Sequence, residues 1–189
     1  MCLFTHAVFC VKIGEDKTIQ DGRNMLERFY PHHEVDSSYE IDYEGLYKAG
    51  YRGVVFDVDN TLVPHGAPAD ERAVALFERL RNIGFQSMLL SNNKEPRVKM
   101  FNDAVKSAYI YKAGKPKVAG YQKAMERMHT TPETTLFVGD QLFTDIWGAK
   151  KAGMETYLVK PIHPKEEIQI VLKRYLEKIV LHFYHKRKA

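Results

Sequence analysis

Two acidic residues, Asp57 and Asp59, directly follow an apolar run in the stretch YRGVVFDVDNTLVPHG at 51–66. The run Val-Val-Phe is typical of a buried strand, and carboxylates beside such a strand are costly to bury without partners. Residues two apart share a side only in extended chain, so the backbone must leave the strand here for both carboxylates to converge. Such a pair suits chemistry that needs a nucleophile and a proton carrier, provided that cations offset the negative charge.

Strands and helices alternate regularly from residue 53 onward. The helix expected at 68–84 places Ala73, Leu76, Leu80 and Ile83 on one face. Continuous apolar strands between helices predict a parallel sheet covered on both faces, that is, a doubly wound α/β fold. Five main strands are expected at 53–58, 85–91, 108–114, 134–140 and 155–161, and further helices at 96–107, 117–128 and 144–153.

The polar residues just after each expected strand are the candidates for function. In doubly wound sheets, ligands bind beyond the carboxyl ends of the strands, near the point where the strand order reverses. One edge of the sheet therefore carries nearly all the candidate chemistry. The residues at this edge are Asp57, Asp59, Asn60, Thr61, Ser91, Asn92, Asn93, Lys115, Asp140 and Asp145.

Four short motifs carry a resemblance to a known family. DVDNTL at 57–62, LLSNN at 89–93, KP at 115–116 and GDQLFTD at 139–145 resemble, in order, the four motifs of the haloacid dehalogenase (HAD) superfamily of phosphohydrolases. The resemblance implies a HAD-like Rossmannoid fold and a Mg²⁺-dependent phosphomonoester hydrolase.

The resemblance also implies roles for individual residues. Asp57 would attack phosphorus and carry a phospho-aspartate, and Asp59 would protonate the leaving oxygen and then activate water. Magnesium would be held by the side chains of Asp57 and Asp140 and by the backbone carbonyl of Asp59, because Mg²⁺ prefers oxygen ligands. Asp145 would support the metal or orient a neighbour. The phosphoryl oxygens would be bound by Thr61, Ser91, the backbone at Asn92, and Lys115.

Simpler interpretations compete with these roles. Asp57, Ser91 and Asp145 are also residue types that cap helices or form turns. An EF-hand is excluded, because the sixth loop position is Leu62 instead of Gly and the twelfth is Pro68 instead of Glu. The dipeptide KP occurs again at 160–161, and YLVKPI resembles the fifth strand of receiver domains. AYIYKAG lacks the phosphoacceptor Asp that a receiver needs, so Lys115 is predicted for the site and Lys160 for the surface.

The motif spacing leaves no room for a cap domain. Asp57 lies 34 positions before Ser91, which lies 24 positions before Lys115, and a helix and a strand fill each interval. An open site favours bulky substrates. The motif spelling, together with SSYEIDYEGLYKAGYRG before it, is similar to the YqeG family of the superfamily's IIIA branch. That family is related to phosphatidylglycerophosphate phosphatases, so the resemblance implies a lipid phosphomonoester as the leading substrate. The alternatives are a sugar, nucleotide or protein phosphate, or a non-catalytic binding module.

The C-terminal segment predicts a helix with an apolar face made by Ile168, Val171, Leu172, Tyr175 and Ile179, followed by a basic tail. Two interpretations stay open: peripheral contact with a membrane, or packing of a terminal helix on the sheet. His65 is either a substrate contact or a turn residue.

Composition limits the class of protein. The formal net charge of +4 over 189 residues and a pI near 8.9 are too mild for a dedicated nucleic-acid binder. Cys2 and Cys10 have no disulfide or metal spacing, and no apolar run approaches a membrane span, so a cytoplasmic protein is expected.

Residues 1–50 are interpreted as an N-terminal extension and lead-in, and 51–189 as the phosphatase domain with its C-terminal helix. Met25 is an alternative start, which would leave residues 1–24 outside the natural protein. The sequence does not reveal the oligomeric state.

Overall fold

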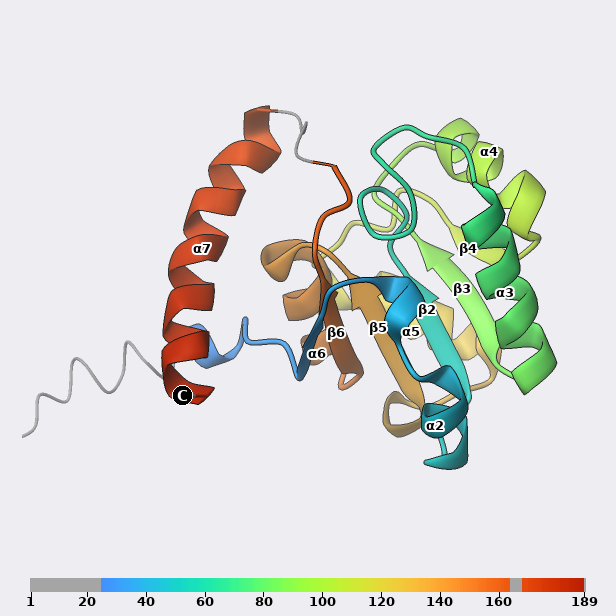
Figure 1. Cartoon of the computed structure of the whole chain (residues 1–189), viewed down its shortest axis with the longest axis horizontal. Helices are drawn as coiled ribbons and strands as arrows, with labels where there is room; N and C mark the ends of the chain where they lie inside the picture. Colours follow the sequence, from blue (N-terminus) through green and yellow to red (C-terminus); the bar gives the residue numbers. More distant parts are fainter. Residues whose placement is uncertain (1–24, 164–167, 189) are drawn as a thin grey trace, which may run out of the picture.

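The computed structural model describes residues 25–163 and 168–188, and its centre is one parallel six-stranded sheet (Figure 1). The question of whether residues 1–24 belong to the natural protein concerns a segment outside this part. The strand order is β1-β6-β5-β2-β3-β4, and every paired neighbour runs parallel. The strands are β1 His33–Val35, β2 Gly53–Phe56, β3 Gln86–Leu90, β4 Ala108–Ile110, β5 Thr135–Gly139 and β6 Glu155–Val159.

The five predicted strands are all present, and β1 is an additional one. It lies within the segment that the sequence analysis interpreted as a lead-in, and its three residues are too few to show an alternating pattern. It forms the edge of the sheet by pairing with β6, where His33 lies opposite Tyr157 and the two rings stack with centroids 4.4 Å apart. Whether residues 33–35 form a strand therefore depends on pairing with a segment far along the chain.

Helices cover both faces of the sheet. Along β2, Val54 and Phe56 pack with residues of α2, α3 and α4, whereas Val55 packs with residues of α5 and α6. This alternation confirms the doubly wound arrangement, because successive strand residues point to opposite faces. The helices are α2 Tyr43–Lys48, α3 Glu71–Ile83, α4 Glu95–Val105, α5 Val118–Met128, α6 Trp147–Lys151 and α7 Ile168–Lys188.

The helix α3 shows how local sequence sets these boundaries. The carboxylate of Asp70 caps its start by accepting a hydrogen bond from the Ala73 amide. Gly84 ends it with φ of 108°, a left-handed conformation that glycine adopts without steric cost. The predicted face is confirmed, since Ala73, Leu76 and Leu80 are buried.

The segment predicted as one helix at 144–153 begins differently. Residues Leu142–Ile146 form a π-helical turn that leads into α6. The carbonyl of Gln141 accepts hydrogen bonds from the amides of both Asp145 and Ile146. Turns of this type are often found at functional sites. Here the turn holds Asp145 close to the end of β5.

The helix α7 lies along the β1–β6 end of the sheet (Figure 1). It packs through Val180 and Tyr184, together with Glu177, and Val180 joins a cluster with Leu142, Ile146 and other residues. Tyr175 and Ile179 of the predicted apolar face are 63% and 55% exposed, so these two residues do not pack on the sheet. The helix offers apolar residues on two sides, and periodicity alone did not identify the packed one.

The side chains of Ile168, Val171 and Leu172 lie outside the described part. None of the helices within 25–163 and 168–188 combines the length and apolarity that crossing a bilayer requires.

Candidate active site

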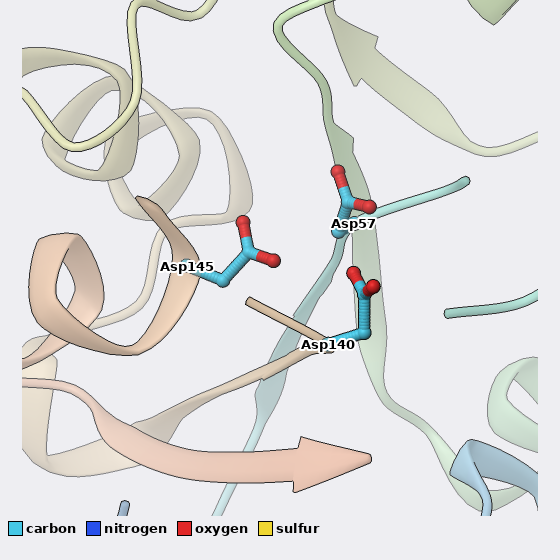
Figure 2. Close-up of side chains that lie close together, drawn as sticks. All are labelled: Asp57, Asp140 and Asp145. Atoms are coloured by element: carbon cyan, nitrogen blue, oxygen red, sulfur yellow. The ribbon is translucent and has the colours of Figure 1, made fainter. Parts of the chain in front are cut away.

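Three acidic side chains meet at the carboxyl end of the sheet. Asp57 follows β2, Asp140 follows β5, and Asp145 comes from the π-helical turn. One carboxylate oxygen of each lies within 4.8 Å of the others, and Figure 2 shows the three side chains lying close together. All three are buried, with at most 6% exposure. Among the described residues, this is the one cluster of potential metal ligands.

Lys115 joins two of these acids. Its Nζ lies 2.5 Å from an oxygen of Asp57 and 2.7 Å from an oxygen of Asp145. The side chain of Asn92 holds the lysine backbone by accepting from the Lys115 amide at 2.7 Å and donating to its carbonyl at 3.1 Å. In contrast, Lys160 pairs with Asp36 on the surface, where both side chains are about two-thirds exposed.

Burial and the closeness of the carboxylates raise the pKa values of Asp57 and Asp140. Burial, aided by the Asp145 carboxylate, raises the pKa of Asp57 to about 7 against the opposing pull of Lys115. Burial likewise raises the pKa of Asp140 well above its usual value, with Asp145 adding to the rise and Arg174 opposing it. Burial alone would lower the pKa of Lys115, but the Asp145 and Asp57 carboxylates outweigh that effect and raise it. The cluster favours cations.

Asp59 is not part of this triad. Its carboxylate accepts hydrogen bonds from Asn93 Nδ2 at 2.6 Å, Arg97 Nη2 at 2.8 Å and the Gly66 amide at 2.7 Å. The chain has left the strand at this point, since β2 ends at Phe56 and Asn60 has φ of 62°. The carboxylate therefore has a fixed orientation beside the triad.

The remaining predicted residues lie around the acids. Thr61 donates from Oγ1 to an oxygen of Asp140 at 3.3 Å. The buried Ser91 hydroxyl accepts from the Asn93 amide at 3.2 Å. Gly139 lies so close to Asp145 that a Cβ at this position would come within 2.7 Å of its side chain. The glycine before Asp140 is thus required by the approach of the turn.

A pocket of about 230 Å³ opens onto these groups. His65, which the sequence left open as a substrate contact or a turn residue, lines the pocket, and its Nδ1 lies 3.8 Å from Asp59. Lys173 of α7 also lines it. Six residues of the predicted edge line it: Asp57, Asp59, Ser91, Asn92, Asn93 and Lys115.

The helix α7 also reaches the triad directly. Arg174 donates from Nη1 to the Asp140 carbonyl at 2.6 Å and from Nη2 to the Asp140 carboxylate. The same guanidinium pairs with Glu177 at 2.9 Å, and Glu177 accepts from the Leu142 amide at 2.7 Å. A charged network therefore ties α7 to the segment that follows β5.

Sequence reasoning missed Arg97, Lys173 and Arg174. A signal for Arg97 was present, because a cation in the first turn of a helix opposes the helix dipole and indicates a nearby anionic partner. For Lys173 and Arg174 the sequence held no local signal, since they lie far beyond the last motif and arrive through packing of α7.

The donor set fits a hard divalent cation. Asp57, Asp140 and Asp145 offer carboxylate oxygens, the ligand type that Mg²⁺ prefers. When all three acids are ionised, Lys115 and Arg174 neutralise two of the three negative charges, so the ionised triad retains one. That residual charge, in a buried site, favours a further cation.

Comparisons with known proteins agree with this geometry. A family model described as HAD-hydrolase-like matches residues 112–167. The Bacillus subtilis protein named Probable phosphatase YqeG is 33% identical over 159 residues, covering 83% of this chain and 92% of that protein. Phosphatidylglycerophosphate phosphatase 1 of Arabidopsis thaliana is 31% identical over 174 residues, covering 78% of this chain and 48% of that protein.

A solved structure supports the fold. The crystal structure of 3-deoxy-D-manno-octulosonate 8-phosphate phosphatase from Yersinia pestis aligns with a TM-score of 0.51 and 14% identity. The alignment covers 69% of this chain and 76% of that one. A dehalogenase structure aligns with a TM-score of 0.50 and 16% identity, over 64% of this chain and 90% of that one.

Proposed function

This chain belongs to the YqeG family of HAD-like phosphatases, and on that premise we propose that it is a Mg²⁺-dependent hydrolase of lipid phosphomonoesters that works through a phospho-aspartate on Asp57. The observation that carries the proposal is the meeting of Asp57, Asp140 and Asp145 around Lys115, beside the separately held Asp59. Nucleophile, cation and proton carrier are then all present in one pocket.

The first step is attack of an Asp57 oxygen on phosphorus. A new bond forms between that oxygen and phosphorus while the bond to the leaving oxygen breaks, and protonated Asp59 transfers its proton to the leaving oxygen. Lys115, 2.5 Å from Asp57, offsets the negative charge that gathers as carboxylate and phosphate approach.

The second step releases phosphate. Asp59, now ionised, removes a proton from a water molecule, and the resulting hydroxide attacks phosphorus, so that the bond to Asp57 breaks and inorganic phosphate leaves. Arg97 and Asn93 hold the Asp59 carboxylate in place through both transfers. Thr61, Ser91 and the backbone at Asn92 are the proposed donors to the phosphoryl oxygens.

Magnesium is proposed to bind the side chains of Asp57 and Asp140 and the backbone carbonyl of Asp59, with Asp145 as support. When bound, it supplies positive charge that offsets repulsion between the carboxylates and the phosphate.

The lipid substrate rests on two supports. The Arabidopsis relative is named a phosphatidylglycerophosphate phosphatase. The chain also has no segment between its motifs that could form a cap, since only α3, β3, α4 and β4 lie between Asp57 and Lys115. An open pocket admits the headgroup of a large substrate. We retain the expected cytoplasmic location, with action at a membrane surface, as part of the proposal.

Hydrolysis assays test the proposal in two stages. The purified chain should release phosphate from p-nitrophenyl phosphate with Mg²⁺ and lose this activity in Asp57→Asn or with excess EDTA. Retained activity in Asp57→Asn would refute the phospho-aspartate, and no activity in the wild type would indicate a binding module.

The second stage compares substrates. Phosphatidylglycerophosphate should be hydrolysed with a kcat/KM at least about tenfold above those for glycerol 3-phosphate, a hexose phosphate, a nucleotide and a phosphopeptide. Preference for one of the soluble esters would refute the lipid assignment and leave the chemistry intact.

A further inference from the structure

An apolar stripe runs along the outer side of α7. Tyr175, Leu176, Ile179 and Phe183 are 63%, 53%, 55% and 44% exposed, and they make up four of the eight large apolar side chains exposed in the described part of the chain. Their spacing places them on one side of the helix, with the buried Glu177 and Tyr184 on the opposite side. We call these four residues the outer stripe.

Positive charge accompanies the stripe. Residues 173–188 contain six Lys or Arg residues and one acid, Glu177, which is buried against Arg174. Arg174 is paired with Asp140 and Arg187 with Glu27. The other four cations of this segment are Lys173, Lys178, Lys186 and Lys188. Lys178 lies over the ring of Tyr175 at 5.4 Å from its centroid, so charge and apolar surface are adjacent. An amphipathic basic helix of this kind suits the surface of an anionic bilayer.

The same helix reaches the active site. Lys173 lines the pocket, and Leu176 of the outer stripe follows it by three residues, so the two are neighbours on the helix. Arg174 fixes the helix to Asp140, which limits movement of the stripe relative to the site. A lipid phosphomonoester presents its phosphate at the bilayer surface, so a helix resting there would bring the pocket to the substrate.

We infer that the outer stripe of α7 is the surface by which this protein docks on an anionic lipid bilayer, with the pocket beside it facing the headgroups. The inference rests on the proposed function, because a water-soluble substrate requires no such contact. Charge complementarity favours an anionic bilayer over a second copy of the chain, since two copies would bring two basic helices together.

Vesicle flotation tests the inference. The wild-type chain should bind vesicles of phosphatidylcholine mixed with phosphatidylglycerol, bind pure phosphatidylcholine vesicles more weakly, and lose binding as salt concentration rises. Replacing Leu176, Ile179 and Phe183 together with Gln should lower the partition coefficient at least about tenfold. Lys178→Gln should lower it about fivefold.

Matched controls come from apolar residues exposed elsewhere. Met100→Gln and Tyr111→Ser remove side chains that are 42% and 39% exposed outside α7, and they should leave vesicle binding unchanged. All stripe variants should hydrolyse p-nitrophenyl phosphate at the wild-type rate, because the stripe does not contact the acids. That activity also shows that the variants are folded.

The inference would be overturned if the wild type did not bind anionic vesicles, or if the triple variant bound them as well as the wild type does. It would also be overturned if the wild type formed a concentration-dependent dimer, lost in the triple variant, and did not bind vesicles. The last result would assign the stripe to a second copy. A short-chain phosphatidylglycerophosphate below its micelle concentration separates this failure from that of the proposed function. Its selective hydrolysis would uphold the lipid substrate even if docking were absent.

Discussion

At the scale of single residues, the proposed mechanism divides the acids of the site between two tasks. Asp57, Asp140 and Asp145 share a buried volume around Lys115, whereas Asp59 is held apart by Asn93, Arg97 and a backbone amide. The proposed division has a physical reason. The nucleophile and the metal ligands act in their ionised form, which a bound cation favours over protonation, whereas a proton carrier must alternate between two states. Under this proposal Arg97 is a positioning residue, since it would act through Asp59.

Arg97→Met should lower kcat for an alkyl phosphate about 10- to 100-fold with little change in KM, because a mobile Asp59 delivers its proton poorly. The loss should be smaller with p-nitrophenyl phosphate, whose leaving group needs no proton. Steady-state assays on both substrates measure the difference, and Arg97→Lys should recover part of the activity.

Lys99→Met is the matched control. Lys99 is exposed on the same helix, and its ammonium group forms an ion pair with Asp103 at 2.7 Å. If Arg97→Met lowered kcat equally for the alkyl phosphate and for p-nitrophenyl phosphate, the positioning role of Arg97 would be contradicted.

At the scale of secondary-structure elements, α7 completes the site that the strand ends begin. Its Arg174 supplies a second cation to the triad, and Glu177 ties the helix to the start of the π-helical turn. Removing the guanidinium would leave the Asp140 carboxylate buried with fewer compensating charges, and the loss of one partner of a buried pair is costly.

Arg174→Met should lower the free energy of unfolding by about 3 kcal/mol in EDTA. Saturating Mg²⁺ should recover part of that loss, because the cation compensates the same acids. Urea unfolding with and without Mg²⁺ measures both effects.

Lys178→Met, on the exposed side of the helix, should change stability by no more than about 0.5 kcal/mol. Equal effects of the two substitutions would show that Arg174 contributes nothing through Asp140.

At the scale of the whole molecule, the buried acids make stability depend on pH and metal together. Burial raises the pKa of Asp57 to about 7, and it raises the pKa values of Asp140 and Glu177 above their usual ranges. In the folded state these groups therefore bind protons more readily than in the unfolded chain, where Asp titrates near its ordinary value. Stability of the metal-free protein should rise as pH falls below about 7 toward that value.

We expect the Tm in EDTA to increase as the pH is lowered from 7.5 to 5.5. The expected increase is about 2–4 °C per pH unit for each additional proton that the folded state binds relative to the unfolded state. Saturating Mg²⁺ should reverse the sign, because the metal binds the ionised acids and its affinity grows with pH. Scanning calorimetry across this range measures both slopes. A Tm in EDTA that rises with pH, or an unchanged slope in Asp57→Asn, would contradict the assignment.

The sequence by itself determined the layered α/β fold and most of the residues at the rim. Each predicted strand and each of Asp57, Asp59, Ser91 and Asp140 belongs to a short local pattern in which polar residues follow an apolar run, and Lys115 belongs to the motif KP. Such patterns depend on near neighbours along the chain, and parallel strands bring their carboxyl ends together wherever the helices between them lie.

Only the tertiary structure decided which side of α7 is buried, that β1 joins the sheet, and that Lys173 and Arg174 reach the site. Tyr175 and Ile179 fit an apolar face as well as Val180 and Tyr184 do, so periodicity could not choose between the two sides. The choice depends on contacts with β6 and the turn after β5. These contacts join segments that are distant in sequence, so their contribution to the free energy cannot be read from the local pattern of apolar residues.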